Sequence, residues 1–298
     1  MTEVPLPDAA RAFVAVTLGE PVDVHPLSGG LSGMRVARVG LADGHDVVVK
    51  WATEGTDSRA GLAVQREAEA LSHLRAHRFD HVAASIATEP GVPALVMQAV
   101  GGGAASAWDS STLASAARVL EDLALVPAHG LRPLPATDVA KPRPHLAQRV
   151  RDALPDDLDL AEVLLGAYWA VSAGPVVDQD GVTLWWDEPA VATHADPHPG
   201  NWLLDAEGRL RLIDLEHLCA GPRGWDLAYL CAHLPGPAPE RAQVLADSGL
   251  GPGGADRLVS AVTAILVAGT VSPDPVWAAR QQALAPSALA LHALLRVR

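Results

Sequence analysis

The sequence is poor in cysteine, in lysine and in positive charge overall. Its two cysteines, Cys219 and Cys231, are too few for a disulfide framework and favour an intracellular chain with buried thiols. The formal net charge of −13 disfavours general binding to nucleic acid, because neutralising phosphates requires a basic surface. An acidic surface instead suits a cationic small molecule, or serves solubility alone.

The sequence also lacks the features of a secreted or membrane-spanning chain. Its first residues contain no basic segment, and Pro5 and Pro7 interrupt them, so they make a poor signal peptide. The apolar run from Leu258 to Pro273 has 16 residues, fewer than the roughly 20 that span a bilayer. We therefore expect a cytoplasmic protein with neither a membrane nor a nucleic acid as partner. The sequence does not predict an oligomeric state.

The patterns that are present divide the chain into a strand-rich part and a helical part. Strand-like runs cover residues 23–50 and 82–100. Helical patterns cover residues 8–18, 59–78, 111–128, 145–173 and 238–298. We predict an α+β fold with two lobes. It has a small antiparallel-sheet N-terminal lobe (residues 1–100), a hinge at about 97–103 and a larger, mainly helical C-terminal lobe (residues 104–298).

Residues 194–214 (HADPHPGNWLLDAEGRLRLID) are the segment most typical of a catalytic site. Two prolines and a glycine near its start exclude a helix and predict a loop. Short strands at 202–204 and 210–213 then flank a turn at Glu207-Gly208. The segment therefore predicts a polar loop that leads into a β-hairpin.

The predicted hairpin places two oxygen-bearing side chains side by side. A turn centred on Glu207-Gly208 makes Leu204 face Arg211. In the same register Asn201 faces Asp214, close enough for both to bind one Mg²⁺ together with substrate phosphates. Asp196 lies in the preceding loop, where it can meet a hydroxyl group near the metal.

Three segments in this order resemble the aminoglycoside phosphotransferase/choline kinase family, which has a protein-kinase-like fold. They are HADPHPGNWLL, LIDLEH and GPRGWDLAYL, and the resemblance covers about residues 20–235. It implies transfer of the γ-phosphoryl group of ATP or GTP to a hydroxyl group of a small molecule, with Mg²⁺ as cofactor.

The resemblance also implies a role for each matching residue. Asp196 is expected to be the catalytic aspartate, and Asn201 and Asp214 the Mg²⁺ ligands. His194 is expected to brace the loop, and Asp226 to anchor it through backbone N–H groups.

The loop departs from the family pattern at two positions. Ala195 stands where the family usually has glycine, so we expect its backbone to avoid positive φ. Pro197 stands where an aliphatic residue is usual, and it removes one N–H donor beside Asp196.

Phosphoryl transfer also requires a cation for the nucleotide phosphates. Only two of the 22 basic side chains are lysines, and one of them, Lys50, ends the strand-like run Val47-Val48-Val49. Such a lysine needs a carboxylate to hold it. Glu67 and Glu69 are the candidates, and only one of them can face Lys50, because they lie about 200° apart around a helix. The family resemblance implies that Glu67 is the pairing glutamate.

Two further segments are expected to contact the nucleotide. One is a loop rich in serine and glycine, and the other is the hinge. Small residues whose N–H groups can approach phosphate are Ser28, Gly29, Gly30, Ser32 and Gly33. The backbone around Gln98 and Val100 is expected to bind the base of the nucleotide, which can be either adenine or guanine.

The acceptor is less well defined. Acidic residues within 152–162 could attract a cationic antibiotic of the aminoglycoside or basic-peptide type, or could form a solvated helix face. Two other functions stay open. One is a catalytically weak, kinase-like nucleotide-binding module. The other is a metal-dependent hydrolase, whose ligands would be His194, Asp196, His198 and Asp214.

Overall fold

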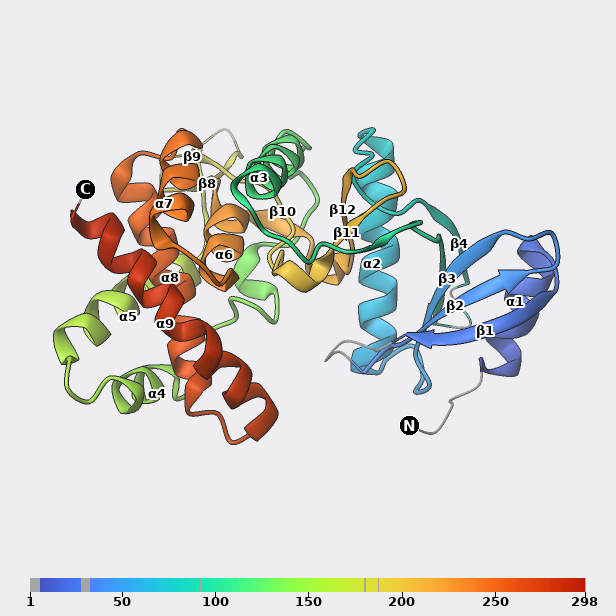
Figure 1. Cartoon of the computed structure of the whole chain (residues 1–298), viewed down its shortest axis with the longest axis horizontal. Coiled ribbons are helices and arrows are strands. Elements are labelled where there is room, and N and C mark those ends of the chain that lie inside the picture. Colours follow the sequence, from blue (N-terminus) through green and yellow to red (C-terminus); the bar gives the residue numbers. More distant parts are fainter. Residues whose placement is uncertain are drawn as a thin grey trace. The chain divides into compact units, whose positions relative to one another are not determined.

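The computed structural model describes residues 6–27, 33–89, 91, 93–179, 181–186 and 188–297 of the 298-residue chain. The chain forms two compact units (Figure 1). Unit 1 comprises Met1–Ala104 and Leu203–Leu218, and unit 2 comprises Ala105–Trp202 and Cys219–Arg298. The hairpin segment 203–218 therefore groups with the N-terminal unit, although the sequence suggested that it belongs to the C-terminal lobe. No helix in the described part of the chain has the length and apolar character of a membrane span.

Unit 1 is built on a five-stranded antiparallel sheet with the order β1-β2-β3-β5-β4. Its strands are β1 (Pro21–Leu27), β2 (Arg35–Leu41), β3 (Asp46–Trp51), β4 (Ser85–Glu89) and β5 (Ala94–Gln98). Helix α1 (Asp8–Leu18) packs its buried Val14 against Val39, Val49 and Trp51 of the sheet. The β-branched residues predicted as strands thus form the core of this unit.

Helix α2 (Arg59–Ala76) belongs to the same unit and contacts strands β3, β4 and β5. Ser58 caps it by accepting a hydrogen bond from the Gly61 N–H at 3.0 Å. Its buried face carries Glu67, whereas Glu69 is exposed. The helix therefore decides which of the two glutamates lies against the sheet.

The hairpin consists of β11 (Trp202–Leu204) and β12 (Leu210–Leu212), and β6 (Gly103–Ala104) extends it to the order β12-β11-β6. The predicted register is wrong by one residue, because the Asp205 N–H donates to the Arg209 carbonyl at 2.9 Å. The physical reason is a three-residue loop. The Gly208 N–H closes a turn on the Asp205 carbonyl at 3.0 Å, and Gly208 takes a left-handed φ of 76°.

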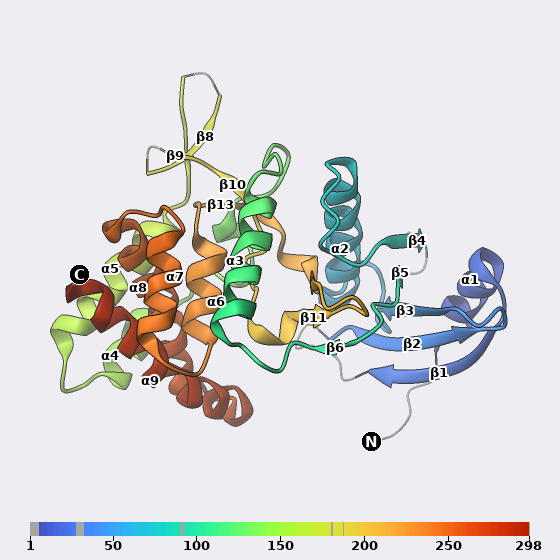
Figure 2. The same cartoon turned by 45° about the horizontal axis from the view of Figure 1, so that its top comes forward.

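Unit 2 is mainly helical (Figure 2). Its helices are α3 (Ser110–Ala124), α4 (Leu146–Ala153), α5 (Leu158–Ser172), α6 (Trp225–His233), α7 (Ala238–Asp247), α8 (Pro252–Thr270) and α9 (Pro275–Val297). Its short strands are β7 (Val176–Val177), β8 (Thr183–Trp185), β9 (Glu188–Pro189), β10 (Val191–Thr193) and β13 (Cys219–Gly221). One-turn 3-10 helices cover Leu134–Ala136 and Pro199–Asn201 here, and Leu215–His217 in unit 1.

Three of the five acidic residues of 152–162 have local partners in unit 2. Asp157 caps α5 by accepting the Leu160 N–H at 3.0 Å, and Glu162 pairs with Arg151 at 2.8 Å. Asp152 accepts a hydrogen bond from Gln148 at 2.7 Å. These contacts fit the interpretation of this segment as a solvated helix face.

Candidate active site

Three charged side chains from distant parts of the sequence meet in unit 1. Lys50 on β3 lies 2.7 Å and 2.6 Å from the two carboxylate oxygens of Glu67 on α2. Its ammonium group also lies 2.9 Å from Oδ1 of Asp214. The Lys50 and Glu67 side chains are 8% and 2% exposed, whereas that of Asp214 is 29% exposed. The predicted pairing of Lys50 with Glu67 rather than Glu69 is therefore present.

The two carboxylates keep Lys50 charged although it is buried. Burial alone would lower the pKa of Lys50, but the negative charges of Glu67 and Asp214 outweigh it and raise the pKa above its usual value. The Leu215 N–H donates to Oε1 of Glu67 at 3.4 Å and helps to hold that carboxylate. The cluster thus presents a fixed cation beside the partly exposed carboxylate of Asp214.

Asp214 has a left-handed backbone, with φ of 66° and ψ of 57°, just before the 3-10 helix Leu215–His217. Aspartate tolerates this conformation better than most residues do. The local geometry of the chain thus turns the carboxylate back toward Lys50 on β3.

The loop that contains Asp196 lies in unit 2, and α6 holds it. Both carboxylate oxygens of Asp226 accept backbone N–H groups, from His194 at 2.7 Å and from Ala195 at 2.9 Å. The Trp225 indole donates to the Ala195 carbonyl at 3.1 Å. Burial raises the pKa of Asp226 to about 7, the two N–H donors oppose this, and the charge of Asp196 adds to it.

The expectation that Ala195 avoids positive φ is wrong, because its φ is 74°. Successive N–H groups that converge on one anion require such a backbone, and here the His194 and Ala195 N–H groups converge on Asp226. An alanine in this conformation costs about 1–2 kcal/mol relative to a relaxed backbone. The anchoring contacts offset that strain.

Asp196 and Asn201 lie together in the same loop. The Asn201 side-chain N–H group donates to the Asp196 carbonyl at 2.8 Å. The amide oxygen of Asn201 can then act as a metal ligand. His194 is fully buried, and its Nδ1 accepts the Asp196 N–H at 3.3 Å. The Trp202 indole donates to the Pro197 carbonyl at 3.0 Å. Pro197 therefore lacks an N–H donor but still contributes an acceptor to the loop.

Tyr229 is a neighbour of Asp196 that the sequence did not single out. It is buried on α6, and burial, followed by interaction with Asp196, raises its pKa well above the usual value. Its ring stacks on that of His233, with the ring centres 4.0 Å apart, and the centre of the Trp225 ring lies 6.2 Å from its own. The four-residue spacing of Trp225, Tyr229 and His233 on one helix face is the signal that could have identified it.

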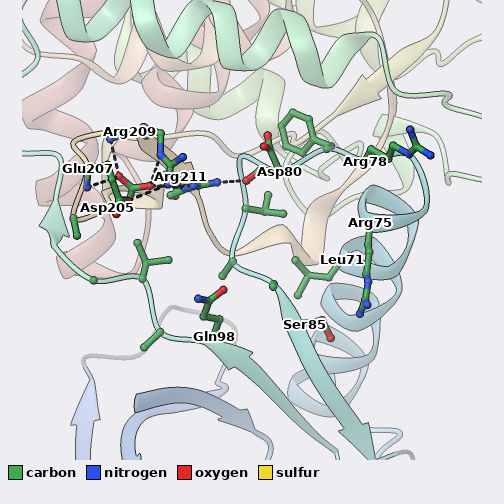
Figure 3. A pocket seen from close by; sticks show the side chains of 18 residues that line it. Leu71, Arg75, Arg78, Asp80, Ser85, Gln98, Asp205, Glu207, Arg209 and Arg211 are labelled. Atoms are coloured by element: carbon green, nitrogen blue, oxygen red, sulfur yellow. Dashed lines mark hydrogen bonds and ion pairs between the residues drawn. The ribbon is translucent and has the colours of Figure 1, made fainter. Parts of the chain in front are cut away.

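The remaining candidate nucleotide residues lie in unit 1. Gly33 has a left-handed φ of 84°, while Ser28, Gly29, Gly30 and Ser32 lie outside the described residues. The Gln98 and Val100 side chains line a cavity of about 830 Å³, together with the end of α2 and the Asp205–Arg211 turn (Figure 3). Lys50, Glu67 and Asp214 are not among its lining residues. This cavity is therefore distinct from the charged cluster.

The described residues contain no group of three or more His, Cys, Asp or Glu side chains placed to hold a metal ion. The two oxygen donors proposed for Mg²⁺ are the Asn201 amide, which lies in unit 2, and the Asp214 carboxylate, which lies in unit 1. Such hard oxygen ligands suit a Mg²⁺ that keeps water and substrate phosphates as its other ligands.

Comparison with solved structures shows a protein-kinase-like fold. A candidate fructosamine-3-kinase from Thermobifida fusca is 20% identical, with 95% of this chain and 98% of that one covered and a TM-score of 0.62. A choline kinase from Streptococcus pneumoniae is 14% identical, with 94% and 98% covered and a TM-score of 0.58. A thermostable aminoglycoside phosphotransferase solved with ADP and hygromycin B is 16% identical, with 94% and 98% covered and a TM-score of 0.57.

Comparison with protein families shows to which family the chain belongs. No curated protein sequence matches the chain significantly. A model of the phosphotransferase enzyme family matches residues 23–258, which is most of the chain. The neighbours named above are small-molecule kinases and phosphotransferases by their descriptions. The chain belongs to the phosphotransferase enzyme family and is an enzyme of the small-molecule kinase type.

Proposed function

We propose that this enzyme transfers the γ-phosphoryl group of ATP or GTP to a hydroxyl group of a small molecule, with Mg²⁺ as cofactor. The observation that carries the proposal is the buried contact of Lys50 with Glu67 and Asp214, at 2.6 Å and 2.9 Å. A lysine fixed by two carboxylates suits the binding of nucleotide phosphates better than a role in stability alone, because buried ion pairs contribute little net stability.

Each proposed site residue has a distinct task. Lys50, held by Glu67, orients the nucleotide phosphates, and Asp196 orients the acceptor hydroxyl and accepts its proton. Asn201 and Asp214 would hold Mg²⁺, which supplies positive charge to the phosphates when it is bound. His194 and Asp226 position the loop of Asp196 without contacting substrate.

The nucleotide base and the hinge form a second part of the proposal. We propose that residues at about 97–103, which lie near the end of the first segment of unit 1, act as the hinge, and that the backbone at Gln98 and Val100 binds the base. The glycine-containing segment that ends at Gly33 would cover the phosphates. ADP in a solved neighbour supports an adenine nucleotide as one co-substrate.

The alternative hydrolase is the weaker proposal. It needs His194 as a metal ligand, yet that side chain is fully buried and its Nδ1 already accepts a backbone hydrogen bond. The binding-module alternative rested on Ala195 and Pro197, and the loop retains its anchoring contacts at both positions. The buried free thiols of Cys219 and Cys231 fit the proposed cytoplasmic location.

The test is a coupled assay of ADP or GDP release with Mg²⁺. The acceptors are aminoglycosides, basic peptide antibiotics, macrolides, nucleoside antibiotics, choline, amino acids and sugars. We expect acceptor-dependent release that falls by roughly 10²–10⁴-fold in Asp196→Ala, while nucleotide binding persists. Equal release in that variant would remove Asp196 from the mechanism. A chain that binds neither nucleotide would overturn the proposed function.

A further inference from the structure

A cavity of about 280 Å³ lies beside the loop of Asp196, wholly within unit 2. Its lining residues are Pro199, Gly200, His233, Pro235, Arg280, Ala283 and Leu284. Pro199 and Gly200 follow Asp196 in the loop, and His233 stacks on Tyr229, which interacts with Asp196. The cavity thus lies where an acceptor molecule could extend while its hydroxyl group meets Asp196.

Arg280 on α9 is the charged side chain of this cavity. It is exposed, and its guanidinium carbon lies 5.9 Å from the centre of the Trp277 ring, which helps to orient it. Within the part of the chain that the structure describes, Arg280 has no carboxylate partner. An arginine in that situation offers its planar set of N–H donors to a ligand.

Charges of both signs lie near the cavity, with Asp196 and arginines both acting on Tyr229. Burial lowers the pKa of His233 to about 3 although its hydrogen bond with the Tyr229 backbone opposes this, so His233 is neutral at physiological pH. Arg280 and Arg143 both act on Tyr229 in the direction that favours its ionised form. Two arginine charges therefore lie near the tyrosine that faces Asp196.

No acidic side chain is among the lining residues of the cavity. Among the acids at 152–162 that could have attracted a polycation, Asp157 accepts the Leu160 N–H and Glu162 pairs with Arg151. A cationic acceptor that extended into this cavity would meet like charge, and an anionic one would meet an arginine fork.

We propose that the acceptor carries an anionic group, a carboxylate or a phosphate, that Arg280 binds while the acceptor hydroxyl lies at Asp196. This inference rests on the proposed function and names its substrate class. Arg143 adds attraction at longer range. The enzyme would then select hydroxylated acids or phosphorylated polyols over amines of the same carbon skeleton.

The test measures binding of matched probes to the full chain with Mg²⁺ and ADP present. One set is glycerate, glycerol 3-phosphate, glycerol and serinol, and the other is glucuronate, glucose and glucosamine. We expect an anionic member to bind about 10- to 100-fold more tightly than its neutral and cationic counterparts, because a charge-assisted hydrogen bond contributes that much. Carboxylate and phosphate probes distinguish the two sources of charge.

Variants of Arg280 connect that preference to the cavity. Arg280→Gln is expected to abolish it and Arg280→Glu to reverse it toward the amines. Arg118→Gln, an exposed arginine on α3 away from the cavity, should change nothing. The inference is overturned if no anionic probe binds, if neutral or cationic probes bind equally well, or if Arg280→Gln retains the preference. Binding of ADP, measured separately, reports on the proposed function itself.

Discussion

The ammonium group of Lys50 lies 2.6 Å from Oε2 of Glu67, and both side chains are buried. Glu69, two residues further along the same helix, is exposed. Substitution of Glu67 therefore tests the ion pair, and the same substitution at the exposed Glu69 is its control within the same helix. Lys50 has a second carboxylate partner, Asp214, which a substitution at Glu67 leaves in place. Such a substitution therefore removes only the more deeply buried of its two partners.

Glu67→Ala should lower the free energy of unfolding by about 3 kcal/mol, because it leaves the buried Lys50 only partly compensated. It should also weaken nucleotide binding, since Lys50 loses its orientation. Glu69→Ala should change stability by less than about 0.5 kcal/mol, as exposed substitutions usually do. Denaturant unfolding and ADP titration of both variants check this prediction. Equal losses in the two would show that the contact with Lys50 has no special role.

Asp214→Asn should keep the fold and weaken Mg²⁺-dependent nucleotide binding. Asparagine also tolerates the left-handed backbone at this position, where φ is 66°, but it lacks the negative charge that attracts the metal. Titration of ADP with and without Mg²⁺ separates the two effects, because only the Mg²⁺-dependent part should fall. Asp214→Ala should lose the same part. Full Mg²⁺ enhancement in either variant would exclude Asp214 as a metal ligand.

Ala195→Gly should change stability by less than about 1 kcal/mol. Relief of about 1–2 kcal/mol of backbone strain is offset by about 0.8 kcal/mol for the lost methyl group and about 0.4–1 kcal/mol of added unfolded-state entropy. Ala195→Val should lose at least about 2 kcal/mol, because a branched side chain must enter a buried left-handed position. Denaturant unfolding measures both changes, and turnover should persist in the glycine variant. A tolerated valine would contradict the assigned backbone.

His233→Phe should make the protein less sensitive to acid. The pKa of His233 falls from 6.5 to about 3 on folding, so the folded state binds fewer protons than the unfolded state between these values. Its neutral form contributes stability above pH 6.5, and that contribution is lost as the pH falls toward 3, by up to about 1.4 kcal/mol per pH unit. Phenylalanine keeps the stack on Tyr229 and does not titrate.

Asp226 works in the opposite direction over much of this range. Its pKa rises from 3.8 to about 7 on folding, so its contribution to stability is present below pH 3.8 and is lost as the pH rises through 7. The difference between the wild type and His233→Phe therefore isolates His233. Unfolding free energies at pH 7, 6, 5 and 4 measure it, and two parallel curves would show that His233 is not buried in its neutral form.

Local sequence determined much of this protein. The prolines of 197–200 exclude an α-helix, and the chain forms the one-turn 3-10 helix Pro199–Asn201 there instead. Ser58 and Asp109 begin helices by accepting N–H groups from residues three positions on. The predicted helix at 8–18 agrees with α1, and the choice of Glu67 over Glu69 followed from helix geometry and the family pattern. These features depend on neighbours in sequence or on residues whose chemistry is rare in the chain, such as lysine.

Tertiary structure decided what local sequence could not. Ala195 has a positive φ because Asp226, far along the chain, draws two successive N–H groups together, and no local preference of alanine predicts that. Arg280 became part of a cavity beside the loop of Asp196 only because α9 packs against α6. Contacts between residues remote in sequence set these outcomes, because the free energy of packing exceeds the small local preferences of the backbone.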